Sequence, residues 1–383
     1  MRKNKFRDQL VTFSYFLVLY IPSMKYLFFS SLINIFSTAL LIFSIIISTN
    51  KIIISKSRFF VVLIFVTFIF TQLLSGFNAD ISLEIQDIFK YISLIIVVSS
   101  IGLIYQFIRM DKLHMYIISW SNILLILYAT GIISPSGAGE LSYLILSMQL
   151  GIGFCAAISL AILSKKLNIF YLANAIILLL TITTLAGRTS IIISVIILVF
   201  SFLLYIKNNY NENKVKAFCF LFILLIALII AWPFILNNVL NEYFLYKLGN
   251  MFTSGDSRFD IYYTSANLIY DNWLGIGLHK YNTILGIYPH NIFIEAMLNA
   301  GIISGLLLLI FVAIWFFLFI RNLFYCKKED VYKVSISLIS LFLFISWNTS
   351  NNITSAYVPF SAMILLIMIS IKKEKQNNQS NLS

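Results

Sequence analysis

Residues 255–305 hold side chains whose types and order are suited to chemistry on an anionic substrate. Ser257 and Asp260 have the spacing of a capping box, so we expect a helix to begin near Arg258. The free N–H groups of a helix start and a guanidinium group both attract anions. The segment therefore predicts a site for a phosphate-like group.

Two further stretches place polar side chains at expected helix starts. In "LAGRTSIIIS", Arg188 stands where an apolar span begins, and in "YPHNIFIEAML", Pro289 is followed by His290 and Asn291. Proline suits the first turn of a helix, so we expect a short surface helix over 290–299, with a separate span from Gly301. Two arginines and a histidine on one face could hold a pyrophosphate and supply a titratable base.

Each of these residues also has a plain structural interpretation. Arg188 could be a snorkelling anchor at a span boundary, and Arg258 could be a solvated residue that pairs with Asp256. His290 could cap a helix or lie at the membrane interface. Trp273 is typical of an interfacial anchor. Gly275 and Gly277 are expected to shape a turn.

A second histidine and several carboxylates compete for the same roles. His279 is the other candidate base, but the charge of neighbouring Lys280 should lower its pKa and weaken it. Glu295 lies one turn beyond His290, where it could orient that base or face water. The acidic stretch "DISLEIQD" (residues 80–87) contains no His or Cys that would complete a metal site. We therefore expect a solvated surface there, with neither a metal nor a cofactor.

The composition indicates an all-α polytopic membrane protein. Hydrophobic residues make up 60% of the chain, charged residues 11%, and the mean hydropathy is +0.93. Apolar runs long enough to cross a bilayer recur along the whole sequence, and the first is expected to be a retained helix rather than a cleaved signal. About twelve spans are predicted, at 9–23, 27–48, 59–77, 89–105, 115–134, 143–164, 168–186, 189–206, 217–236, 301–320, 334–350 and 356–371.

The basic residues predict the orientation of these spans. Most of the 27 Lys and Arg residues fall in alternate short connections, which the positive-inside rule assigns to the cytoplasm. Both termini are then cytoplasmic. The net charge of +12 is explained by topology, so it gives no reason to expect a nucleic acid partner.

The same topology divides the chain into three parts: spans 1–9 over 1–237, one sizeable external loop with short surface helices over 238–300, and spans 10–12 with a cytoplasmic tail over 301–383. No span carries an ionisable residue near its centre, which argues against an ion-coupled transporter. Cys155 and Cys219 are expected within spans and Cys326 on the cytoplasmic side, so no disulfide framework is implied.

The order of these motifs resembles that of a known family. "AGRTS", then "SRFDIYYTSANLIYDNWLGIGLHKY", then "PHNIFIEAMLNAGIISG" is similar to the shared core of the O-antigen ligases and Wzy-type O-antigen polymerases. The resemblance covers about 185–305. It departs at Ala186-Gly187, where members commonly have Ser before the Arg. The matching positions are Arg188, Arg258, Asn272, Leu274, Gly275, Gly277, His290, Asn291, Gly301 and Gly305.

The resemblance implies a metal-independent, inverting glycosyltransferase of the GT-C type in a bacterial inner membrane, with its active site facing the periplasm. Its donor would be a glycan on undecaprenyl pyrophosphate. Arg188 and Arg258 would hold the pyrophosphate, and His290 would be the general base for the acceptor hydroxyl. Trp273, Gly275, Gly277, Asn291 and Glu295 would support the site.

Four functions are compatible with these residues and with the resemblance. The first is a polysaccharide polymerase whose donor and acceptor are both lipid-linked, with a flippase and a chain-length regulator as further partners. The second is the ligase that transfers the chain to lipid A-core. A transporter of lipid-linked glycans and a capsule or teichuronic-type polymerase of a Gram-positive cell are the others. The compact chain and modest external loop favour the first.

Overall fold

The structure, a computed structural model, describes residues 5–28, 32–78, 85–134, 142–163, 168–185, 187, 189–207, 258–325, 330–349 and 351–371. These residues form helices and their connections, with no β-strand among them. The all-α polytopic membrane fold predicted from the sequence is confirmed. The expected span at 217–236 lies outside the described residues, and each of the other expected spans falls on a helix.

The bundle consists of long apolar helices joined by short connections. Among the described residues, seven helices are long and apolar enough to cross a membrane, and α2, α7 and α14 are shorter but apolar. In chain order the bundle helices are α1 (Lys5–Leu27), α2 (Leu32–Ser48), α3 (Lys56–Ser75), α4 (Ile85–Ile104), α5 (Met110–Ala129), α6 (Tyr143–Leu163), α7 (Ile169–Thr184), the helix Thr189–Lys207, α12 (Ile292–Tyr325), α13 (Val331–Asn348) and α14 (Tyr357–Ser370).

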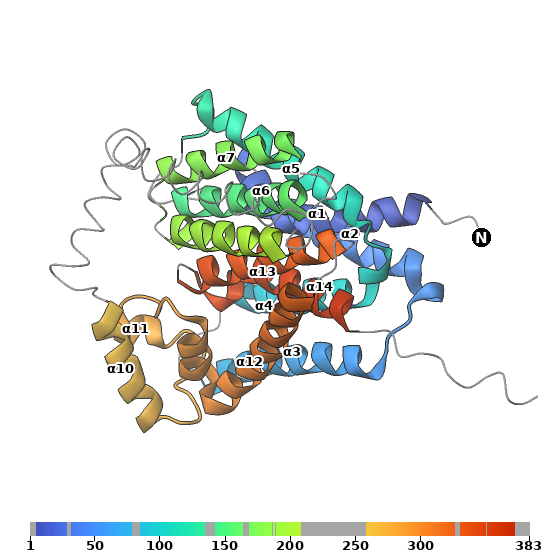
Figure 1. The fold of residues 1–383 in the computed structure, drawn as a ribbon. Helices are drawn as coiled ribbons and strands as arrows, with labels where there is room; N and C mark the ends of the chain where they lie inside the picture. The colour runs from blue at the N-terminus through green and yellow to red at the C-terminus, as the bar shows by residue number, and fades with distance from the viewer. Residues whose placement is uncertain are drawn as a thin grey trace, which may run out of the picture.

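Helix α6 lies at the centre of one half of the bundle, in contact with α5, α7 and α13 (Figure 1). Small residues permit this close packing. A Cβ atom on Gly151 would lie 1.9 Å from the Phe342 ring, and one on Gly153 would lie 2.2 Å from the Ser121 hydroxyl. Glycines at helix contacts let neighbouring chains approach in a bilayer, where burial from water cannot drive association.

The outward surfaces of the helices remain apolar. Large hydrophobic side chains are exposed along α2, α3, the helix Thr189–Lys207 and α12, which is the surface expected of helices that face lipid. Examples are Ile35, Ile46, Phe59, Phe60, Phe70, Val199, Leu203, Leu309 and Phe317.

Two short helices, α10 (Arg258–Asp271) and α11 (Tyr281–Leu285), lie beside the start of α12 at one end of the bundle (Figure 1). The first turns of α1 lie toward the other end. Helix α12 is interrupted at Ala300 and Gly301, whose backbone angles are not helical. The predicted separation of a short helix from a span beginning at Gly301 is confirmed, and the candidate site is built around that interruption.

Candidate functional site

The turn that follows α10 is held against the interruption of α12 by backbone hydrogen bonds. The Ile276 amide donates to the Leu298 carbonyl over 2.7 Å, and the Gly277 amide donates to the Asn299 carbonyl over 3.1 Å. In return, the Ile302 amide donates to the Trp273 carbonyl over 3.0 Å. The break in α12 leaves the carbonyls of Leu298 and Asn299 without donors from their own helix. The amides of the turn supply those donors.

Glycine is required where these two backbones meet. Gly275 has a φ of +92°, and a Cβ atom there would lie 2.6 Å from both the Asn299 carbonyl oxygen and the Gly301 nitrogen. Gly301 has a φ of +79°, and its Cβ would lie 2.5 Å from the Trp273 carbonyl oxygen. The predicted turn at Gly275 and Gly277 is confirmed, and its role is to lock the turn to the break in α12.

His290 and Asn291 form the start of α12. The Asn291 side-chain oxygen accepts hydrogen bonds from the amides of Phe293 and Ile294, at 2.9 and 3.2 Å, so Asn291 is the N-cap of the helix. The Ile292 amide donates to the Asn348 side chain over 3.0 Å, which ties this helix start to the end of α13. His290 precedes the cap with a φ of +52°, a backbone state that few non-glycine residues adopt.

Tyr288 connects Arg258 with His290. The Tyr288 and His290 rings lie 4.1 Å apart, centroid to centroid, at a tilt of 50°. Burial raises the pKa of the Tyr288 hydroxyl, and the positive charge of Arg258 acts on it in the opposite direction. Arg258 is partly buried and is the first residue of α10, as the sequence predicts. The fold thus brings the start of α10 and the start of α12 to one place, through a tyrosine that the sequence gave no reason to select.

Arg188 lies outside the described residues, so its expected role remains a prediction. The residues on either side of it belong to the same end of the bundle. The Thr349 hydroxyl donates to the Thr189 hydroxyl over 3.2 Å, and residue 349 directly follows Asn348, the partner of the α12 start. Gly187 is buried, and a Cβ there would lie 2.8 Å from the Ser147 hydroxyl.

Glu295 is buried inside the site and has two hydrogen-bond donors. The Tyr281 hydroxyl donates to its Oε1 over 2.9 Å, and the Ile353 amide donates to its Oε2 over 2.9 Å. Burial and the neighbouring carboxylate raise the pKa of the Tyr281 hydroxyl well above its usual range, so this group remains a donor. Of the two alternatives that the sequence left open for Glu295, exposure to water is wrong, because the side chain is buried. Its carboxylate joins α11, α12 and the short helix η6 (Ile353–Ser355).

His279 occupies a polar position between the turn and α4. Its amide donates to the Asn299 side chain over 3.0 Å, and its Nδ1 lies 3.3 Å from the Tyr281 hydroxyl. Its Nε2 lies 3.9 Å from an oxygen of Asp87, which also pairs with Lys90 at 2.8 Å. Burial lowers the pKa of His279, Asp87 raises it, and Lys90 lowers it. A lowered pKa was predicted, but the cause is burial and not Lys280.

The expectation of a solvated acidic surface is wrong for Asp87, whose side chain is 22% exposed and is paired. The other acidic residues of that stretch, Asp80 and Glu84, lie outside the described residues. A histidine does approach Asp87 through the fold, although none is near it in sequence. Within the described part of the chain, no group of three or more His, Cys, Asp or Glu side chains could hold a metal ion.

Aromatic side chains in and just after α10 remain exposed, although the helix packs against α12. Phe259 is 71% exposed and Trp273 is 58% exposed, while Ser265 is the buried residue of this helix. The exposed rings of Phe259 and Trp273 are suited to contact with a lipid surface, as in an interfacial helix. Trp273 contributes its backbone carbonyl to the contact with α12 and leaves its ring outside.

Sequence reasoning missed Tyr281, Tyr288 and Asp87. Tyrosine has an apolar ring and a polar hydroxyl, and one tyrosine among the 21 in the chain gives no local signal of a special role. Asp87 meets His279 from a distant part of the sequence, and Tyr281 meets Glu295 from another helix, so the sequence does not indicate these contacts. What results is a cationic helix start, a histidine of unusual backbone conformation and a buried polar network behind them. Such a set can bind an anion and accept a proton.

Comparison with known proteins gives a match over this part of the chain. Residues 173–310 match the family model described as O-antigen ligase. The matched range includes most of α7, the whole helix Thr189–Lys207, α10, α11 and the first part of α12. The resemblance that the motifs indicated is therefore confirmed. No curated protein matches the chain.

Proposed function

We propose, from the O-antigen ligase family match and the geometry at the start of α12, that this chain polymerises a polysaccharide. It transfers a glycan from undecaprenyl pyrophosphate to the terminal sugar of a second lipid-linked glycan. The observation that supports this best is Tyr288, whose ring lies 4.1 Å from that of His290 before α12 and whose hydroxyl is influenced by the charge of Arg258 at the start of α10. A pyrophosphate leaving group and an acceptor hydroxyl need those two groups.

The proposed reaction needs one proton transfer and one substitution. His290 takes the proton of the acceptor hydroxyl while that oxygen attacks the anomeric carbon of the donor sugar. The bond from that carbon to the pyrophosphate oxygen breaks on the opposite face, so the configuration inverts. Undecaprenyl pyrophosphate leaves with both electrons of that bond, and Arg258, together with Arg188, stabilises its charge. His290 then returns its proton to water.

Polymerisation and transfer to lipid A-core are supported to different degrees. The match is to a family described as O-antigen ligase, which keeps transfer to lipid A-core as a second candidate. An anionic core acceptor is better bound by a surface rich in cations. Residues 258–291 carry only Arg258 and Lys280 as cations, and Arg258 is assigned to the donor. This scarcity favours a neutral, lipid-linked acceptor.

We propose that the chain lies in an inner membrane with both termini in the cytoplasm and residues 238–300 outside. The division at 237 and 300 is retained, although α12 continues through residue 300 with a break in its helical geometry. The basic connections between spans support this orientation. A reporter enzyme that is active only outside the cytoplasm should be inactive when fused at Ser383.

Gene deletion distinguishes the two candidates. Loss of a polymerase should leave lipid A-core carrying at most one repeat unit, visible as a single step on a lipopolysaccharide gel. Loss of a ligase should instead leave bare core while long chains accumulate on undecaprenyl pyrophosphate. Restoration by the wild-type gene, and not by a His290→Asn variant at equal protein level, connects the result to this site. Bare core with accumulated chains would contradict the polymerase proposal.

A further inference from the structure

A cavity of about 560 Å³ opens beside the candidate site, among α1, α2, α4, α14 and η6. None of its lining residues belongs to the grouping around His290. Ligand pockets commonly have volumes of about 300–1,000 Å³, so the cavity is large enough to take part of a substrate. The cavity plays no part in positioning Arg258 or His290, so its presence has to be explained separately.

The walls of the cavity are those of a site for a hydrocarbon chain. Ile21 from α1, Ile35 from α2, and Phe89 and Val97 from α4 line it. Ile35 is 66% exposed and Phe89 is 63% exposed, and both lie on apolar helices of the bundle. The opening between α2 and α4 is therefore on a surface that faces lipid, where a chain could enter sideways from the bilayer.

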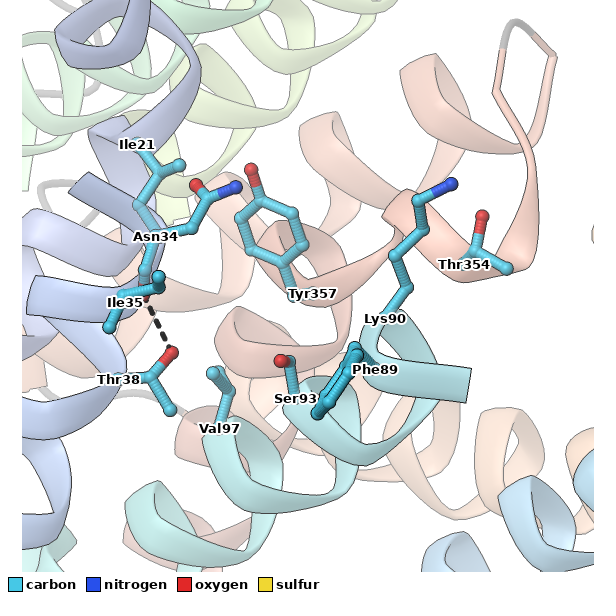
Figure 2. A pocket seen from close by; sticks show the side chains of 10 residues that line it. All are labelled: Ile21, Asn34, Ile35, Thr38, Phe89, Lys90, Ser93, Val97, Thr354 and Tyr357. Carbon is cyan, nitrogen blue, oxygen red and sulfur yellow. Dashed lines mark hydrogen bonds between the residues drawn. The ribbon is translucent and has the colours of Figure 1, made fainter. Parts of the chain in front are cut away.

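Several polar groups gather toward one side of the cavity, and Lys90 is the cation among the described residues that line it. Figure 2 shows the polar ends of Asn34, Lys90, Thr354 and Tyr357 in the upper half of the view, with Val97 below them. Among the described residues that line the cavity, none carries a carboxylate. The Lys90 side chain is 53% exposed and its ammonium group has more than one donor, so its pair with Asp87 leaves donors for a ligand.

The polar end adjoins the network behind the candidate base. Lys90 pairs with Asp87, whose carboxylate lies 3.9 Å from Nε2 of His279. On the other side, Thr354 follows Ile353, whose amide binds Glu295. A headgroup held at Lys90 would thus lie next to the elements that support the start of α12.

We propose that this cavity binds the isoprenoid chain of the acceptor lipid, with the phosphate of that lipid at Lys90. This inference rests on the proposed polymerase function, which requires two lipid-linked substrates at once. The apolar walls bury the first isoprene units, and the ammonium group neutralises the phosphate that follows them. The donor keeps its own phosphate groups at Arg258, so the two headgroups occupy separate cations.

Stoichiometry of lipid binding tests the cavity without any turnover. The probe is radiolabelled undecaprenyl phosphate, added to the purified full chain in detergent. We expect two molecules bound per wild-type protein and one in Ser93→Trp, because the indole would fill the cavity that Ser93 lines. Ile92→Trp is the matched control, since Ile92 is the adjacent residue, is 40% exposed and does not line the cavity. Equal stoichiometry in the two tryptophan variants would overturn the inference.

The headgroup contact is tested by Lys90→Met. Loss of a charge-assisted hydrogen bond should weaken binding of the second undecaprenyl phosphate on the order of tenfold or more. Unlabelled undecaprenyl phosphate should displace the second probe molecule, whereas phosphatidylglycerol and inorganic phosphate should not. Displacement by phosphatidylglycerol at the same concentration would show a general lipid groove and contradict an isoprenoid site.

The two proposals fail in different ways. If the deletion phenotype is that of a ligase but Ser93→Trp still removes one of two bound undecaprenyl phosphates, the polymerase proposal falls and the cavity remains a polyprenyl site. If polymer is made normally by Ser93→Trp and its lipid stoichiometry matches that of Ile92→Trp, the polymerase proposal stands and the cavity assignment is wrong.

Discussion

The Tyr281 hydroxyl donates a hydrogen bond over 2.9 Å to Oε1 of Glu295, and both side chains are buried. The other oxygen of that carboxylate accepts from the Ile353 amide. One buried carboxylate therefore connects the short helix α11, the first turns of α12 and the connection before α14. The position of His290, five residues before Glu295, depends on this connection.

Removing the carboxylate should cost more stability than removing its hydroxyl partner. Burial raises the pKa of Glu295 to about 7, so Tyr281→Phe deletes one hydrogen bond to a carboxyl group that is not fully charged, worth about 0.5–1.5 kcal/mol. Glu295→Ala leaves both the Tyr281 hydroxyl and the Ile353 amide without an acceptor, and each unsatisfied donor should cost about 1–3 kcal/mol of stability. Thermal unfolding of the detergent-solubilised protein should give a lower midpoint for Glu295→Ala than for Tyr281→Phe. The exposed Tyr270 supplies a neutral control as Tyr270→Phe. The reverse order of midpoints would show that the carboxylate is not the centre of this network.

Gly275→Ala should be far more damaging than Gly286→Ala. Both glycines have positive φ, at +92° and +69°, so both variants carry backbone strain. Only the Cβ at position 275 would collide with the Ala300–Gly301 backbone, whereas nothing lies within 4 Å of a Cβ at position 286. We expect Gly275→Ala to fail to accumulate, or to lose activity, while Gly286→Ala keeps most of both. Protein level and polymer formation measure this. Equal effects would mean that strain alone, and not contact with α12, requires glycine here.

The spans and the helix starts could be predicted from the sequence because both have local signals. Apolar runs of bilayer length predict the spans, and Asn-Ala-Gly within residues 290–305 predicts the break in α12. The contact between the Gly275 turn and that break could not be predicted in the same way. The contact consists of backbone hydrogen bonds between two segments that are separated in the sequence. A glycine in a loop is compatible with many geometries, so it does not predict such a contact.

Stability should depend on the charge of His279 at mildly acidic pH. Burial lowers the pKa of this side chain in the folded protein, so between its unfolded value of about 6.5 and the lower folded value the unfolded chain binds more protons. Stability is therefore lost as pH falls through that interval and is unaffected by this group above it. Thermal midpoints from pH 8 to pH 5 should fall less steeply in His279→Asn than in wild type. Asparagine tolerates the φ of +58° at this position.

Parallel pH curves for wild type and His279→Asn would contradict this origin of the acid sensitivity. His279→Gln at the same position is the second variant, because it removes the titrating group but is less suited to positive φ. It should lower the midpoint at every pH while leaving the slope as flat as that of His279→Asn.

Arg258→Lys should lose most activity although it keeps the positive charge. A guanidinium group binds two phosphate oxygens in a fixed plane, and an ammonium group does not. Polymer made from purified lipid-linked substrate measures the loss, and binding of undecaprenyl pyrophosphate should weaken in parallel. Lys280→Arg, on the neighbouring turn, is the control and should be neutral. Near-normal polymer from Arg258→Ala at matched protein level would remove Arg258 from the site.

Only the residues of the candidate site that would bind the anion or accept the proton could be predicted from the sequence. Arg258 and His290 could be selected because helix starts with such residues have a physical use, and the structure groups both around Tyr288. The supporting residues could not be assigned in this way. Glu295 has an ordinary place on an expected surface helix, and its burial follows from residues 281 and 353, which only the tertiary fold brings to it.

The most direct measurement of the central claim is single-turnover transfer by His290→Asn, with purified protein and lipid-linked donor and acceptor. Asparagine suits the φ of +52° but cannot act as the base, so the backbone is kept while the proton acceptor is lost. We predict that the rate falls by about 10²–10⁴ with donor binding unchanged, and that the matched His279→Asn keeps most of its activity. A near-normal rate for His290→Asn, or a larger loss for His279→Asn, would contradict the assignment of His290 as the base.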